Sequence, residues 1–182
     1  MKYGSYNYNS MAFIPSEIAY GVEQTLSAGY VDNYIGYWGT WYQGIAKTNK
    51  AIDCLRKFGQ MSDEDKARLE AEIKFVRASL YFDLMKRYKE IIIYDENLDA
   101  YTKDKAYSTE EEGWDFVYND LKFAADNLPA RESANGRINK DMAWAFMTRA
   151  MLCAERGDVV KTAEEEVERL GYGLEENYAD SY

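Results

Sequence analysis

The sequence has no histidine, and it has only two prolines and two cysteines among its 182 residues. The absence of histidine excludes Ser-His-Asp and Cys-His nucleophiles, histidine-based zinc sites and the commonest general base, which leaves carboxylates as the main route to acid–base chemistry. Cys54 and Cys153 lie in apolar periodic segments and lack metal-ligand spacing, so we interpret both as small buried side chains. We therefore expect no metal site, and no sequence feature indicates a cofactor.

Long apolar runs and basic blocks are also missing. No stretch approaches the roughly 20 apolar residues that span a bilayer. The first residues, Met1 to Tyr6, have neither the apolar run nor the cleavage site of a signal peptide, so any export signal or lipid anchor is expected outside this sequence. Because 22 Lys and Arg face 32 Asp and Glu, the net charge is −10, and we expect no nucleic-acid partner.

Apolar and aromatic residues are plentiful, at 47% and 15% of the sequence, which excludes a disordered chain. Apolar residues recur at spacings of three and four over long stretches, and this pattern is typical of amphipathic helices. We therefore predict an all-α fold in a single domain over residues 1–182, with an irregular segment over 1–33 and helical repeats over 34–182.

Local signals predict where the helices begin and end. The first helix is predicted over Tyr34 to Phe58, ended by Gly59 in a left-handed cap. A second follows from Ser62, which forms a capping box with Asp65. It carries two apolar stripes and should be buried on two sides; the stripes are Leu69, Ile73, Val76, Leu80 and Leu84, and Phe75, Phe82 and Met85.

Beyond the second helix, residues 89–107 lose the helical period and are predicted to form a long connection. A third helix starts near Ser108 and stops before Pro129. Asn139 should cap a largely buried helix over Met142 to Ala154. The dipeptide Gly157-Asp158, which should end that helix and cap the next, is typical of a tetratricopeptide unit.

Four segments in order give a more specific signal. The first is Trp38-x-x-x-Tyr42-x-x-Ile45-x-x-x-Asn49, and the second is the run from Glu72 to Leu84 continuing to Arg87-Tyr88. The third is Ser108 to Pro129, and the fourth runs from Gly136-Arg137 through Gly157-Asp158 to Asn177-Tyr178. Together they resemble the N-terminal, tetratricopeptide-like region of the SusD/RagB family of Bacteroidetes outer-membrane lipoproteins.

This resemblance implies a function in nutrient uptake. Its members capture oligosaccharides at the cell surface as the partner of a SusC-like TonB-dependent transporter, so we expect glycan binding at the outer membrane and no catalysis. Family members are longer than this chain, and a C-terminal portion would follow Tyr182. Membrane association would then depend on a lipid anchor that is absent from this chain. The connection after Tyr88 departs from the family, because it reads Lys89-Glu90-Ile91-Ile92 instead of turning through Gly towards Pro.

Sugar capture requires flat aromatic faces for pyranose rings, together with carboxylates or amides for the hydroxyl groups. Suitable side chains gather where the irregular segment meets the first helix. The candidate ligand-binding residues are Tyr30, Asp32, Asn33, Tyr34, Tyr37 and Trp38. Tyr34 and Trp38 also lie on the apolar stripe that continues through Ile45, so core packing is the competing interpretation for these two residues.

Arg77, Glu72 and Asn49 are interpreted as architectural. On a densely apolar helix, Arg77 and Glu72 should form a buried ion pair or hydrogen-bonded contact between neighbouring helices, and the Asn49 amide should bond backbone at a helix crossing. Two other functions remain open. One is a protein-interaction scaffold without sugar affinity. The other is a glycosidase, which would need two carboxylates about 5 to 10 Å apart across a cleft.

Overall fold

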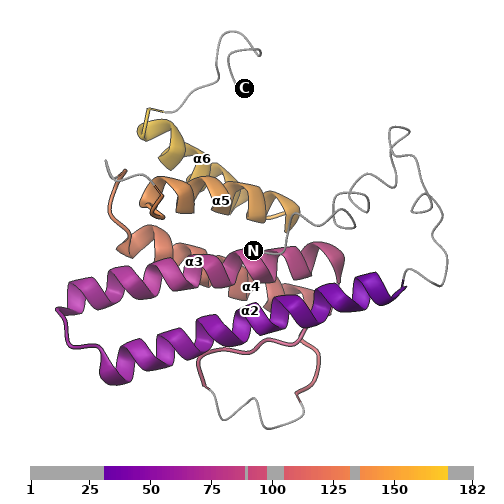
Figure 1. The fold of residues 1–182 in the computed structure, drawn as a ribbon. Coiled ribbons are helices and arrows are strands. Elements are labelled where there is room, and N and C mark those ends of the chain that lie inside the picture. Colours follow the sequence, from indigo (N-terminus) through magenta and orange to yellow (C-terminus); the bar gives the residue numbers. More distant parts are fainter. Residues whose placement is uncertain (1–30, 89, 98–104, 132–135, 172–182) are drawn as a thin grey trace. The chain divides into compact units, whose positions relative to one another are not determined.

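The computed structural model describes residues 31–88, 90–97, 105–131 and 136–171, and within these ranges the regular structure is entirely helical (Figure 1). The predicted all-α fold is therefore confirmed. The chain divides into two compact units, Met1–Tyr42 and Gln43–Tyr182. Only the first turns of α2 belong to the described part of the first unit. The second unit contains the rest of α2 and all of the later helices.

Helix α2 spans Val31–Phe58 and so begins before the predicted start at Tyr34. The helix ends at Phe58 as predicted, but not through the predicted left-handed cap at Gly59. Gly59 is not among the described residues with a positive φ angle; instead, a Cβ atom at this position would lie 2.5 Å from the carbonyl oxygen of Leu55. Glycine is required at position 59 because the backbone passes too close to Leu55 for any side chain, not because the cap is left-handed.

Helices α3 (Asp63–Arg87) and α4 (Glu110–Asn127) begin at side-chain caps. The Ser62 hydroxyl accepts from the Asp65 amide and donates to its carboxylate. Ser62 therefore caps α3 as predicted, but the Asp65 carboxylate bonds the hydroxyl and not the Ser62 amide that a capping box requires. Helix α4 starts with a full capping box, in which Thr109 and Glu112 each bond the other's backbone amide. Three acidic residues in its first turn complement the helix dipole.

Helices α5 (Lys140–Cys153) and α6 (Gly157–Arg169) form the last hairpin. Asn139 caps α5 by accepting from the Met142 amide, as predicted. The predicted roles of Gly157 and Asp158 were wrong. Glu155, with φ of 57°, adopts the left-handed conformation that ends α5, and Gly157 is the first residue of α6, which has no side-chain cap.

The core of the second unit is a stacked helical array in which α3 packs on α4, α4 on α5, and α5 on α6 (Figure 1). Alanines at these contacts are fully buried and allow close approach of the backbones, while larger residues fill the space between helices. The buried alanines are Ala71, Ala78, Ala124, Ala125, Ala143, Ala150 and Ala163. Phe82 lies at the centre of an aromatic group and contacts both Trp114 and Phe146.

The burial of α3 and α5 is less complete than the sequence indicates. Phe82, Leu84 and Met85 are buried as predicted, whereas Val76 is 41% exposed. On α5, Met142 and Leu152 are also exposed. Cys54 is half-buried and Cys153 is exposed, so the prediction of two buried cysteines was wrong for Cys153. The reason is that Cys153 lies in the final turn of α5, where the chain leaves the array.

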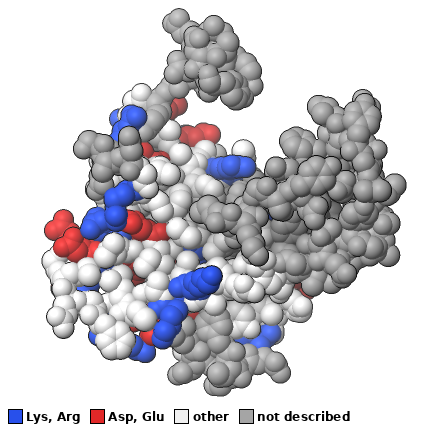
Figure 2. Space-filling model, in the orientation of Figure 1, with Lys and Arg blue, Asp and Glu red and all other residues white. Residues whose placement is uncertain are grey.

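The surface of the described residues carries mixed charge. Figure 2 shows Lys and Arg side chains interspersed with Asp and Glu on one face. Among the described helices, none is long and apolar enough to cross a membrane.

Candidate functional site

The predicted ligand-binding residues are concentrated at the start of α2. Tyr30 lies outside the described residues. Asp32, Asn33, Tyr34 and Tyr37 fall within the first turns of α2, and their side chains also lie outside the described part. Asp32 and Asn33 are thus helical, whereas the sequence places them in the irregular segment. Trp38 is the one predicted residue whose side chain is described, so the rest of the set stays a prediction.

Trp38 forms an aromatic pair with Tyr42, one helical turn further along α2. The two ring centroids are 4.8 Å apart, and the ring planes are inclined by 43°. Both side chains are half-buried. Each ring therefore retains exposed surface, and its neighbour restrains its motion. Such a pair can bind an apolar ligand face at low cost in side-chain entropy.

A second group of functional side chains is a buried charge network around Arg77 on α3. The Arg77 guanidinium, 2% exposed, donates to both carboxylate oxygens of Asp120 on α4, at 2.7 and 2.8 Å. It also donates to Asn49 on α2 at 2.6 Å and to Glu96 at 2.8 Å. The ring of Phe116 lies 4.9 Å from the guanidinium carbon. One side chain thus joins α2, α3, α4 and the connection between α3 and α4.

Glu96 extends this network towards the surface. Its carboxylate bridges Arg77 and Arg56, and Arg56 in turn pairs with Glu70 at 2.6 Å. Burial alone would raise the pKa of the Glu96 carboxyl, but hydrogen bonding and charge from Arg77, together with the charge of Arg56, lower this pKa to about 2. Burial outweighs the effect of Arg77 at Asp120, whose pKa is raised above its ordinary value. Glu96 is therefore the member of the network that is firmly held in its charged form.

The network fixes the connection between α3 and α4 in place. The Tyr81 hydroxyl accepts from the Tyr94 amide at 2.7 Å and donates to its carbonyl at 3.0 Å. The Asn49 amide donates to the same carbonyl at 2.8 Å, which confirms its predicted bond to backbone. Ser108 closes the connection by donating twice to the carbonyl of Ile91. Residues 90–97 are thus anchored by side chains of the helices.

Glu72 does not join this network. A buried contact with a neighbouring helix is predicted for it, but its carboxylate instead accepts from Arg68 on the same helix and from Arg137 at the surface. Glu72 and Arg77 are five residues apart in α3, so they point in different directions around the helix. The architectural role predicted for Arg77 is correct, and the partner is Asp120.

The charge of Glu96 should appear in the pH dependence of stability. The pKa of Glu96 is about 2 in the folded chain, compared with 4.5 ordinarily. Between these two pH values the unfolded chain binds more protons than the folded chain. The stabilisation by Glu96 is therefore lost as the pH falls from 4.5 to 2. We expect Glu96→Gln to flatten the pH dependence of the free energy of unfolding there. Urea titrations at several pH values would measure this effect. Glu165→Gln, on the exposed side of α6, is the matched control, and equal slopes for both variants would contradict the assignment.

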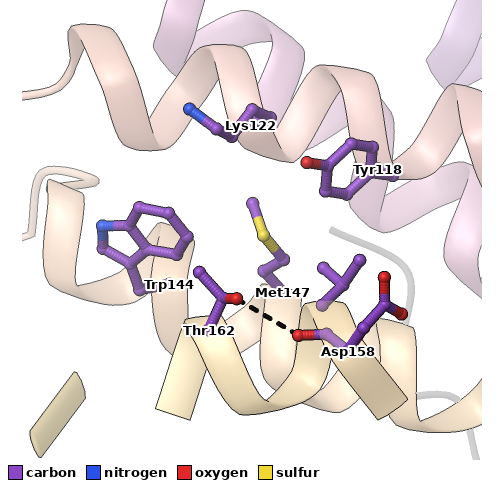
Figure 3. A pocket seen from close by; sticks show the side chains of 7 residues that line it. Tyr118, Lys122, Trp144, Met147, Asp158 and Thr162 are labelled. Atoms are coloured by element: carbon purple, nitrogen blue, oxygen red, sulfur yellow. Dashed lines mark hydrogen bonds between the residues drawn. The ribbon is translucent and has the colours of Figure 1, made fainter. Parts of the chain in front are cut away.

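Sequence reasoning missed a cavity between α4, α5 and α6. Its volume is about 260 Å³, and it is lined by Tyr118, Lys122, Trp144, Met147, Asp158, Val159 and Thr162 (Figure 3). These residues come from three helices and share no sequence motif, so no local pattern could reveal them. The spacing of Tyr118 and Lys122, and of Asp158 and Thr162, does place each pair on one helix face.

Comparison with known proteins identifies the family. Residues 5–152 match the SusD-like family model described as starch-binding and associating with the outer membrane. A SusD-like protein of Bacteroides ovatus is 25% identical over 166 residues, which are 83% of this chain and 30% of that protein. The crystal structure of a SusD-like protein from Bacteroides fragilis superposes with a TM-score of 0.68 at 33% identity, covering 76% of this chain and 27% of that one.

The fold is shared more widely. A laminarin-binding SusD-like protein, 23% identical, matches with a TM-score of 0.69 over 79% of this chain and 33% of its own length. The chain thus spans about a third of the length of the relatives that it matches. The predicted resemblance is confirmed, because the matched model covers most of the sequence: the chain belongs to the SusD-like family.

Proposed function

We propose that this chain captures oligosaccharides at the bacterial cell surface and binds them without cleaving a bond. The observation that carries this proposal is the match of residues 5–152 to a starch-binding family that associates with the outer membrane. Binding of laminarin by a protein of the same fold supports the ligand class.

The proposed ligand surface lies at the start of α2. The pair of Trp38 and Tyr42 supplies two half-buried rings in contact, and pyranose rings have apolar faces that pack on such surfaces. Asp32, Asn33 and Tyr30 would add groups that bond sugar hydroxyls. We therefore keep Tyr30, Asp32, Asn33, Tyr34, Tyr37 and Trp38 as the proposed contacts.

The proposed partner is a SusC-like TonB-dependent outer-membrane transporter, with a lipid anchor holding the protein at the surface. The stacked helices of the second unit support this part of the proposal, because tetratricopeptide-like arrays present extended surfaces to other proteins. Copurification of a tagged protein with such a transporter would test it.

The glycan function is tested by calorimetric titration of the purified protein with plant, host and microbial oligosaccharides. We expect saturable binding of at least one glycan and no release of reducing sugar from it. Copurification with the transporter and no affinity for any glycan would favour the scaffold function instead. Release of reducing sugar would show a glycosidase and overturn the proposal.

A further inference from the structure

The cavity between α4, α5 and α6 is lined by two polar side chains, half-buried Tyr118 and exposed Asp158, whose functional groups bond no described residue. Among the described residues, neither the Tyr118 hydroxyl nor the Asp158 carboxylate takes part in a hydrogen bond or ion pair. Figure 3 shows the Tyr118 hydroxyl directed from α4 towards the space over Met147, and the Asp158 side chain extending from α6 at the right-hand end of the cavity. The Thr162 hydroxyl donates to the Asp158 carbonyl at 3.1 Å, so this bond leaves the carboxylate open.

The charges around the cavity disfavour an anionic ligand. Asp158 would repel an anion, and Lys122 on the opposite helix is already paired with Asp126 at 2.5 Å, so it would not offset that repulsion. A molecule with several hydroxyl groups can donate to Asp158 and exchange hydrogen bonds with Tyr118 without adding charge.

The volume of the cavity and its apolar wall limit the kinds of ligand that can bind there. Met147 is fully buried and Trp144 is 8% exposed, and together with Val159 they form the apolar side of the cavity. A volume of about 260 Å³ lies just below the range of about 300 to 1,000 Å³ for pockets that hold drug-sized ligands. The space suits one six-membered ring.

We propose that this cavity binds a single neutral, polyhydroxylated ring, such as one monosaccharide unit, between Tyr118 and Asp158. The inference rests on the proposed glycan function for its ligand class, and it adds a site in the second unit, apart from the aromatic surface at the start of α2. Because few groups contact the ligand, we expect a Kd on the order of 1 mM or weaker.

The Met147 methyl group allows a site-specific test on the full chain. The protein carries seven methionines, so labelling their methyl groups with ¹³C yields a simple NMR spectrum in which Met147→Leu assigns the signal. Glucose, galactose and xylose would each be titrated to about 100 mM, well above the expected Kd. We expect the Met147 signal to shift and saturate with at least one sugar, while exposed Met61 and Met142 do not shift.

Variants test whether the polar groups hold the ligand. Tyr118→Phe should weaken binding about fivefold through loss of one hydrogen bond, and Asp158→Asn about tenfold through loss of a charge-assisted one. Asp63→Asn is the matched control, because Asp63 is an exposed aspartate in the first turn of α3, and its Kd should be unchanged. Tyr118→Phe keeps the ring in place, and thermal melts check that each variant is folded.

Two results would overturn the inference. One is a Met147 signal that no sugar shifts. The other is an equal or larger shift with ethylammonium chloride, which would make the cavity a cation site. This outcome can be distinguished from failure of the proposed function, since Trp38→Ala should weaken oligosaccharide binding at least tenfold and leave the Met147 response intact.

Discussion

Asp120→Asn is expected to destabilise the fold by about 3 kcal/mol, because it leaves the Arg77 guanidinium buried without its bidentate partner. Both nitrogen–oxygen contacts of that pair are below 3 Å, and both side chains are almost fully buried. Glu96 still contacts Arg77, which places the loss at the lower end for such pairs. Thermal and urea denaturation would measure it, with a fall in Tm of roughly 6 to 12 °C for a chain of this size.

Asp126→Asn provides the control on the same helix. Asp126 pairs with Lys122 at the surface of α4, and an exposed pair four residues apart stabilises a helix by only about 0.3 to 0.5 kcal/mol. The double variant Arg77→Met and Asp120→Leu should be more stable than Asp120→Asn, because an apolar pair leaves no unpaired buried charge at this position. If Asp120→Asn and Asp126→Asn had equal effects, the central role of the Arg77 network would be refuted.

Trp38→Ala is expected to reduce the affinity for the best oligosaccharide of the panel by at least tenfold, or about 1.4 kcal/mol. Large aromatic anchors contribute most to binding surfaces, and removal of the indole also frees the Tyr42 ring that it contacts. Trp38→Phe should restore part of the affinity, because it retains a flat apolar face. Calorimetric titration would measure both variants.

Phe58→Ala is the matched control for this substitution. Phe58 is an aromatic residue of the same helix and is 74% exposed at its far end. Its removal should leave glycan affinity unchanged. Unchanged affinity in Trp38→Ala, with circular dichroism showing an intact fold, would favour core packing for Trp38 and move the glycan site elsewhere.

Local patterns were sufficient for most of the helical fold. The bonds that define Ser62 and Asn139 as caps join residues three positions apart, so sequence reasoning could find them. Gly59 and Gly157 show the limit of such reasoning. Both glycines were predicted to end helices. Gly59 does follow the last residue of α2, but it avoids a contact with the Leu55 carbonyl instead of forming a left-handed cap, and Gly157 begins α6. The path of the backbone decides between these roles, and local composition does not reveal that path.

Partners distant in the sequence could not be predicted. Asp120 is 43 residues from Arg77, and Arg137 is 65 residues from Glu72. The packing of α3 on α4 decides the first pair, and the second joins α3 to the segment before α5. The cavity has the same origin, since its wall forms only when three helices meet. Of the six residues predicted to bind the ligand, the structure describes only the side chain of Trp38, so the other five depend on the sequence argument.

The connection between α3 and α4 constrains how the helices can change in evolution, because side chains of the helices bond the Tyr94 backbone. Its amide and carbonyl are satisfied by the side chains of Tyr81 and Asn49 instead of by a neighbouring strand. A relative that replaces Tyr81 by phenylalanine must satisfy this backbone in another way, since a buried peptide group without partners is costly. We therefore expect positions 49 and 81 to change together among relatives, even though they lie far apart along the chain.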